Sequence, residues 1–164
     1  MEVSVVPSVD ALHDIALFAG VPPTALEHLL STLSVVAPEP GELLFREGEP
    51  ARDMFLVLDG EMEVLKQSKR GTDARVALLG PGDWFGEMGL VDIQPRSASV
   101  RALAPSHLLR ITAADLDSLY RFDLKSYSLV VLNLARELSR RLRVADGLIA
   151  ELLANVADNY LLHR

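Results

Sequence analysis

The feature that most constrains the fold of this 164-residue chain is a change of hydrophobic period partway along it. From about residue 33 to residue 111, short β-favouring runs are separated by Gly, Pro and Asp. Many short strands at this spacing are typical of a jelly roll or a barrel-like sandwich. From about residue 124 to residue 156 the apolar residues recur with a helical period, and no proline interrupts them. The predicted strands lie at residues 33–37, 42–46, 54–58, 61–66, 75–79, 98–104 and 107–111.

Helical spacing also appears on both sides of the strand region. Residues 11–18 and 24–33 predict two helices before the first strand, and residues 113–120 predict another after the last. The Asp59–Gly60 dipeptide lies between two strand-like runs and predicts a hairpin there. The sequence therefore predicts an α+β fold, in which an antiparallel, jelly-roll-like β-roll carries N-terminal helices and one long C-terminal helix.

Two glycines frame a short segment whose sequence is Phe-Gly-Glu-Met-Gly-Leu, at residues 85–90. We expect a short helix at 87–90, whose first backbone N–H groups and positive dipole end would face an anion. Gly86 and Gly89 allow the main chain to approach a ligand without a Cβ in the way. This segment therefore predicts a site for a negatively charged ligand.

Three polar side chains extend this site. Arg96 supplies a forked guanidinium that matches the geometry of a phosphate, and Ser97 adds a hydroxyl donor. Glu87 is a carboxylate that only accepts, so it would repel a phosphate unless a donor lay between them. The free 2′-hydroxyl of a 3′,5′-cyclic nucleotide is such a donor. The alternative is that Glu87 and Arg96 form an ordinary surface ion pair, which would require neither the glycines nor the Arg-Ser order.

Residues 85–99 as a whole resemble the phosphate-binding cassette of the cyclic nucleotide-binding domain family. That family includes bacterial catabolite activator proteins and the regulatory subunits of cAMP-dependent protein kinase, and the resemblance extends over about residues 11–156. It implies that Glu87 binds the ribose 2′-hydroxyl and that Arg96 and Ser97 bind the cyclic phosphate. It also implies that the phosphate receives backbone N–H groups from Gly86, Glu87, Met88, Gly89 and Leu90.

The same resemblance bears on which base is bound. Residues 140–144 are similar to a segment of catabolite activator proteins after which two hydroxyl residues contact the adenine amino group; this sequence has Ala145 and Asp146 there. The Asp146 carboxylate would accept from the adenine amino group and repel the guanine carbonyl oxygen, which favours cAMP over cGMP as the ligand. Alternatively, Asp146 is only a solvated position on the helix. The alignment also implies that Arg141 reaches Glu87.

The long helix carries a heptad pattern that predicts a parallel homodimer through residues 131–156. A second apolar stripe, which can rest on the β-roll, contains Leu132, Leu134, Leu148 and Leu153. A helix folded back on its own sheet, the alternative, needs only one stripe. The heptad seam, with alternating steps of four and three, is formed by Val131, Ala135, Leu138, Leu142, Ala145, Ile149, Leu152 and Val156.

The predicted organisation has four parts. We expect a flexible N-terminus at 1–10, a ligand-binding β-roll with flanking helices at 11–122, a dimerisation helix at 123–157 and a tail at 158–164. In transcription factors of the family a helix-turn-helix domain follows the long helix, and the tail is too short to form one. The sequence therefore predicts a domain that stands alone.

Composition limits the classes of partner. A net charge of −7 disfavours binding to a nucleic-acid backbone. No apolar run reaches the roughly 20 residues needed to cross a bilayer, and no secretion signal is evident, so we expect a cytoplasmic protein without a membrane partner. The chain has no cysteine and its four histidines are scattered, so no metal site and no catalytic residue are predicted.

Two functions of different class follow from these observations. The first is a sensor that binds cAMP, with cGMP less favoured, and relays the signal through the long helix to an unidentified effector protein. The second is a nucleotide-free β-roll that serves as a dimeric interaction or scaffold module. The Gly86–Glu87 and Arg96–Ser97 pairs favour the sensor.

Overall fold

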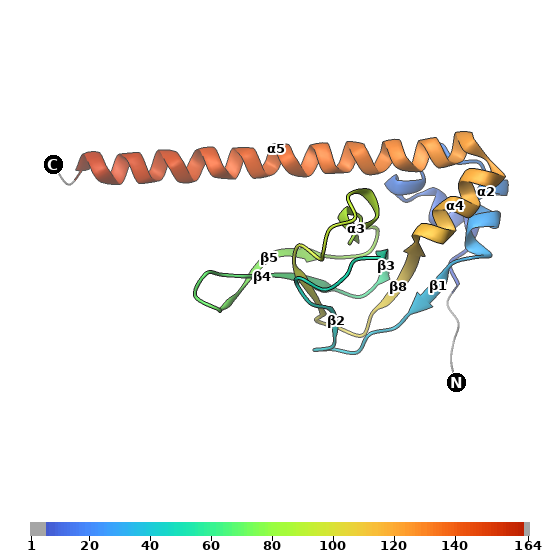
Figure 1. The fold of residues 1–164 in the computed structure, drawn as a ribbon, viewed down its shortest axis with the longest axis horizontal. Coiled ribbons are helices and arrows are strands. Elements are labelled where there is room, and N and C mark those ends of the chain that lie inside the picture. The colour runs from blue at the N-terminus through green and yellow to red at the C-terminus, as the bar shows by residue number, and fades with distance from the viewer. Residues whose placement is uncertain (1–5, 163–164) are drawn as a thin grey trace.

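Two four-stranded antiparallel sheets, several short helices and one long helix make up the computed structural model, which describes residues 6–162 (Figure 1). The predicted α+β architecture is confirmed. The helices are α1 (Val9–His13), the 3₁₀ helix η1 (Ala16–Phe18), α2 (Pro23–Leu30), α3 (Met88–Val91), α4 (Ala113–Phe122) and α5 (Leu124–Leu162). The strands are β1 (Ser34–Val36), β2 (Leu43–Phe45), β3 (Asp53–Asp59), β4 (Met62–Gln67), β5 (Asp73–Leu79), β6 (Trp84–Phe85), β7 (Ser99–Ala102) and β8 (His107–Thr112).

The strand order shows that the predicted hairpin at Asp59–Gly60 is wrong. One sheet has the order β1-β8-β3-β6 and the other β2-β7-β4-β5, so Asp59–Gly60 carries the chain from one sheet to the other. Gly60 has a φ of 96°, and a Cβ at this position would lie 2.1 Å from the Ser106 hydroxyl oxygen. The glycine is therefore required by a close contact between two chain segments rather than by a two-residue hairpin.

The seven predicted strands are present to within two residues at each end, and only β6 was missed. This strand has two residues, both buried, and pairs with the middle of β3 through Phe85 opposite Phe55 and Trp84 opposite Leu56. Two residues cannot show an alternating pattern, so periodicity gives no signal for such a strand.

The two ends of the chain differ from the prediction. Helix α1 begins at Val9, and its first turn is capped by the Ser8 hydroxyl, which accepts from the Ala11 N–H at 3.1 Å. The predicted flexible segment 1–10 therefore includes the start of a helix, whereas its residues 1–5 lie outside the described residues. Helix α5 continues to Leu162, so most of the predicted tail 158–164 is helical.

Two apolar clusters hold the domain together. The first joins the N-terminal helices to one sheet and to the start of α5, with Phe18, Trp84 and Leu134 among its buried members. The second lies between the two sheets and includes Phe55 and Phe85, whose ring centroids are 5.5 Å apart. The segment that follows β6 therefore begins at a point fixed by both clusters.

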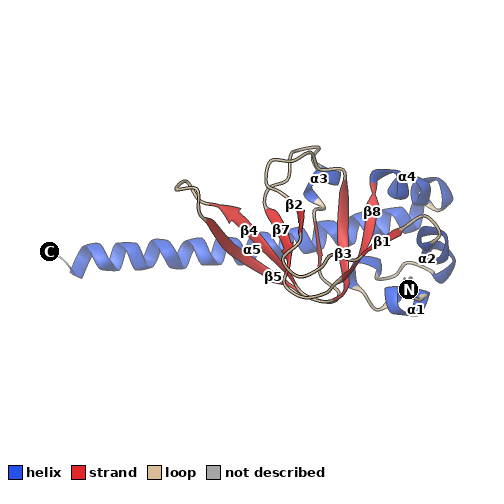
Figure 2. Cartoon of the chain, turned by 90° about the horizontal axis from the view of Figure 1, so that it is seen from below, coloured by secondary structure: helices blue, strands red, loops and turns tan. Residues whose placement is uncertain are grey.

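Helix α5 is anchored at its start and free beyond the roll. The buried Asn133 amide donates to the Leu17 and Ala19 carbonyls, at 3.0 Å each, which fixes the helix to the end of η1. Beyond Arg141, the side chains described are all exposed. Both views show α5 running past the sheets, with the β4–β5 hairpin extending in the same direction (Figures 1 and 2). No helix in the described part of the chain has the length and apolar character needed to span a membrane.

Candidate functional site

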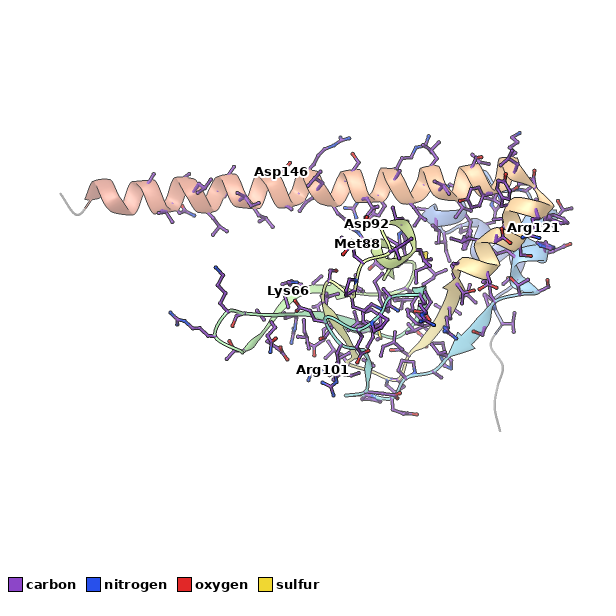
Figure 3. The ribbon with its side chains drawn as sticks, viewed as in Figure 1. Lys66, Met88, Asp92, Arg101, Arg121 and Asp146 are labelled. Carbon is purple, nitrogen blue, oxygen red and sulfur yellow. The ribbon has the colours of Figure 1, made fainter. Side chains whose placement is uncertain are left out.

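A cavity of about 430 Å³ lies between the second sheet, the α3 segment and the middle of α5. Seven of the nine predicted site residues line it, namely Gly86, Glu87, Met88, Gly89, Arg96, Ser97 and Arg141. Leu90 and Asp146 do not. Figure 3 shows Met88 between α5 and the strands, whereas Asp146 lies farther along α5. One cavity therefore unites two segments, 86–97 and 140–148, that are far apart in the sequence.

The two glycines of the cassette are required by contacts within the protein. Gly86 has a φ of 82°, and a Cβ there would lie 2.7 Å from Arg96 Nη1. A Cβ on Gly89 would lie 2.2 Å from the Ala51 Cβ. Internal packing therefore excludes a side chain at both positions, whether or not a ligand approaches the main chain there.

Two of the backbone N–H groups predicted to bind a phosphate have partners within the protein. The Gly89 N–H donates to the Gly86 carbonyl at 3.2 Å, and the Leu90 N–H donates to the Glu87 carbonyl at 2.9 Å. In any helix, only the N–H groups of the first turn lack a partner one turn earlier. The Gly89 and Leu90 N–H groups would therefore have to share or exchange these internal partners to bind a phosphate, and the predicted set of phosphate-binding amides stays a prediction. The half-buried Leu90 side chain packs instead against the first apolar cluster.

Arg96 is buried and already partly neutralised. Its side chain donates to the Asp53 carboxylate through Nη2 and to the Asp53 carbonyl through Nη1 at 2.7 Å. Its guanidinium carbon lies 3.9 Å from the centroid of the Phe45 ring. Arg110 Nε donates to the second carboxylate oxygen of Asp53 at 2.6 Å. Arg96 Nε is buried and has no hydrogen-bond partner among the described residues.

Asp53 is the residue that the sequence reasoning missed. It is buried at the first position of β3. No local pattern identifies it, because its partners Arg96 and Arg110 are 43 and 57 residues away.

Glu87 is a buried carboxylate that is linked to the long helix. It is 3% exposed, and Arg141 Nη1 lies 3.1 Å from its Oε1. Burial raises the pKa of Glu87, Arg141 acts against this shift, and the charge of Glu137 adds to it. Arg141 also donates to the Trp84 carbonyl at 2.8 Å and to Glu137 at 2.9 Å. The helix is therefore tied to the cassette through one arginine.

The opposite end of the cavity is apolar and borders α5. Helix α5 contributes Val144, Ala145 and Leu148, and β5 contributes Val76 and Leu79. Asp146, predicted to read the base, is exposed and does not line the cavity of its own chain. Adjacent residues on a helix point in different directions, so a sequence alignment alone does not place Asp146 beside a ligand.

The polar groups of this site are not arranged to hold a metal. Within residues 6–162 there is no group of three or more His, Asp or Glu side chains close enough to bind a metal ion. The chemistry of the cavity is that of a guanidinium, a hydroxyl and a carboxylate beside an apolar wall, which suits an organic ligand with an anionic group and a sugar.

Comparison with known proteins gives consistent matches. A family model described as "Cyclic nucleotide-binding domain" matches residues 36–122. The chain is 36% identical over 130 residues to the cyclic AMP receptor protein of Thermus thermophilus, which covers 79% of this chain and 58% of that protein. It therefore spans little more than half the length of this relative.

Two solved structures share the fold. The crystal structure of Thermus thermophilus catabolite activator protein matches with a TM-score of 0.74 and 36% identity, over 85% of this chain and 63% of that chain. The N-terminal domain of a transcriptional regulator from Streptomyces coelicolor matches with a TM-score of 0.71 and 28% identity, over 80% of this chain and 94% of that one.

Proposed function

The chain belongs to the cyclic nucleotide-binding domain family, and we propose that it is a sensor of cAMP that relays binding through α5 to an effector protein. The strongest support is the convergence of the Arg96 guanidinium, the Ser97 hydroxyl and the buried Glu87 carboxylate in one cavity. We propose a binding role rather than a catalytic one, because these groups provide a cation, a donor and an acceptor without a nucleophile–base pair.

Each polar group has a distinct partner on the ligand. Arg96 and Ser97 would donate to the cyclic phosphate, and Glu87 would accept from the ribose 2′-hydroxyl. The phosphate must share Arg96 with Asp53. The Asp53 carbonyl already accepts from Arg96 Nη1, and its carboxylate accepts from Nη2. Arg96 Nε is buried and has no partner among the described residues, so a phosphate would satisfy this costly donor only after a shift of the Arg96 side chain.

cAMP is the proposed ligand for two reasons. The Thermus thermophilus relative, 36% identical over the aligned region, is named as a cyclic AMP receptor protein. The apolar wall formed by Val76, Val144 and Leu148 suits the faces of a purine, and the Asp146 carboxylate would prefer an adenine amino group to a guanine carbonyl. This second reason requires Asp146 to reach the site.

Dimerisation would bring Asp146 of one chain close to the cavity of the other. If the predicted seam pairs in parallel, Leu142 and Ile149 occupy heptad position a. Arg141 then occupies position g, and Asp146 occupies position e of the next heptad. Such g and e positions of neighbouring helices lie side by side in a parallel coiled coil. We therefore propose that the partner subunit's Asp146 lies beside Arg141, next to the cavity. Exposure of the seam in the single chain supports this pairing, since Ile149 is 54% exposed.

Calorimetric titration tests the proposal directly. The chain should bind cAMP, bind cGMP more weakly, and bind neither 5′-AMP nor adenosine appreciably, because these lack the cyclic phosphodiester. Gel filtration with light scattering should give the mass of a dimer. Absence of heat with millimolar cAMP would contradict the sensor, and tighter binding of cGMP would reverse the choice of base.

The internal ion pairs favour a second candidate, the nucleotide-free dimeric scaffold. Asp53 already pairs with Arg96, and Arg141 already pairs with Glu87, so these charges have partners without a ligand. A thermal-shift assay separates the two functions. A sensor gains RT ln(1 + [L]/Kd) of stability when it binds cAMP, whereas a scaffold is indifferent to the nucleotide.

A further inference from the structure

An ion pair next to the cavity holds the segment that carries Ser97. Lys66 Nζ lies 2.7 Å from Glu47 Oε1 and also donates to the Ser97 carbonyl oxygen. The other carboxylate oxygen of Glu47 accepts from the Gln67 N–H at 3.0 Å. The pair therefore joins the loop after β2, the end of β4 and the last part of the cassette, residues 96–99. The hydrogen bond from Lys66 is the main cause that lowers the pKa of Glu47.

Further hydrogen bonds hold residues 96–99 to the loop after β2. The Arg96 N–H donates to the Glu49 carbonyl at 2.8 Å, and the Gly48 N–H donates to the Arg96 carbonyl at 2.9 Å. The Glu47 N–H donates to the Ser99 hydroxyl at 2.9 Å. These bonds fix the residues on either side of Ser97 but not Ser97 itself.

Ser97 has few other constraints. Its side chain is exposed, and among the described residues its hydroxyl contacts only the Met88 sulfur, at 3.8 Å. The Lys66 ammonium is therefore the charged group that fixes the peptide of Ser97. Lys66 does not line the cavity, so it makes no direct contact with a ligand there.

We infer that Lys66, oriented by Glu47, is a positioning residue that aims Ser97 at the ligand phosphate. This inference rests on the proposed function, because it concerns the phosphate end of the same cavity. A hydroxyl binds a phosphate well only in a narrow range of directions, and an unrestrained Ser97 peptide would sample others. Neither Glu47 nor Lys66 was predicted as a site residue from the sequence.

Substitution of Lys66 provides the test. Lys66→Met should weaken cAMP binding by about tenfold, since a hydrogen bond with a charged partner contributes this order of free energy. Lys66→Arg keeps a donor in place and should restore affinity to within about threefold of the wild type. Lys69→Met removes an exposed lysine of the β4–β5 turn and should change nothing. Thermal denaturation of each variant would show whether the fold is retained.

A double-mutant cycle distinguishes positioning from general stabilisation. If Lys66 acts through Ser97, then Lys66→Met should add little to the loss already caused by Ser97→Ala. Equal losses from Lys66→Met in both backgrounds, or unchanged affinity in the single variant, would overturn the inference. If Lys66→Met fails to fold, Glu47→Gln supplies the same cycle with a smaller expected loss.

The outcomes also separate this inference from the proposed function. If the wild-type chain binds cAMP and Lys66→Met binds it equally well, only the role of Lys66 is contradicted. If neither the wild-type chain nor Lys69→Met binds cAMP, the sensor itself is contradicted and the positioning role is lost with it.

Discussion

The two ends of the cavity differ in how far a single chain completes them. At the phosphate end the charged groups are buried, and each has a partner: Arg96 with Asp53, and Glu87 with Arg141. At the apolar end, α5 contributes Val144 and Leu148, both more than half exposed. The phosphate end is therefore preorganised within the chain, whereas the apolar end leaves surface for a ligand, a second helix or both to cover.

This difference reflects how each end is built. The phosphate end is made by a short segment folded against two sheets, so internal packing fixes its geometry before any ligand arrives. The apolar end is made by a helix anchored far away, at Asn133, and tied to the cassette by Arg141. A ligand that bridges both ends can therefore change the position of α5, provided that it binds one position more tightly than another.

The largest expected effect is at the preorganised end. Arg96→Leu should weaken cAMP binding by about 100-fold, because charge-assisted contacts with the phosphate are lost. Asp53 keeps Arg110 as a partner, so we expect the variant to fold with a lower melting temperature. Calorimetry and thermal denaturation measure both quantities, with Arg70→Leu as a control at an exposed turn. Wild-type affinity in a folded Arg96→Leu variant would refute the assignment.

The second effect concerns the sugar. Glu87→Gln should weaken cAMP binding by about tenfold, because a hydrogen bond to a charged acceptor contributes on the order of 1.5–3 kcal/mol. The 2′-deoxy analogue of cAMP lacks the donor, so wild type and variant should bind this analogue equally well. If Glu87→Gln weakens binding of both ligands by the same factor, Glu87 acts on the fold of the cassette rather than on the ribose.

At the phosphate end, the sequence predicted the residues that lie close together in the chain and missed one that does not. Gly86, Glu87, Arg96 and Ser97 lie within twelve residues of one another, so a local motif identifies them. Asp53 depends on pairing between distant strands, and no periodicity shows that pairing.

Long-range packing also explains the wrong hairpin prediction and the position of Asp146 outside the cavity of its own chain. The Asp59–Gly60 turn has the composition of a hairpin, but the sheet to which each strand belongs is decided elsewhere in the chain. The position of Asp146 depends on the rotation of α5 about its axis, which is set by buried residues such as Asn133 and Leu134. Local patterns therefore predicted elements and a motif, and tertiary packing decided how they meet.

The third effect tests whether the apolar end needs a second chain. Leu142→Lys places a charge on the seam and should convert the dimer to a monomer in light scattering. Asp146→Ala should keep the dimer, yet both variants should reduce the preference for cAMP over cGMP by about threefold, the order expected for one exposed charged contact. Glu151→Ala, an exposed acidic position off the seam, is the matched control. A preference that survives in the Leu142→Lys monomer would exclude a contribution from the partner's Asp146.

The smallest expected effect is the pH dependence of binding at the preorganised end. Burial raises the pKa of Glu87. As the pH falls toward this raised pKa, Glu87 gains a proton and loses the negative charge that strengthens its hydrogen bond from the ribose. Affinity for cAMP should therefore decline on mild acidification in the wild type, and Glu87→Gln should not show this decline. A parallel decline in both proteins would assign the titration to another group.

Stability should respond to pH with a different sign at the two glutamates, which keeps the binding experiment interpretable. The pKa of Glu87 is raised by folding, so its charge disfavours the folded state at neutral pH and that cost disappears on acidification. The pKa of Glu137 is lowered from 4.5 to about 2, chiefly by its hydrogen bond with Arg140. Its stabilising contribution is present above pH 4.5 and is lost only as the pH falls toward about 2. Between neutral pH and pH 4.5, Glu137 keeps its stabilising contribution and Glu87 loses its cost, so acidification destabilises the fold through neither group. A fall in affinity in this range without a fall in melting temperature therefore reports on Glu87 in the site.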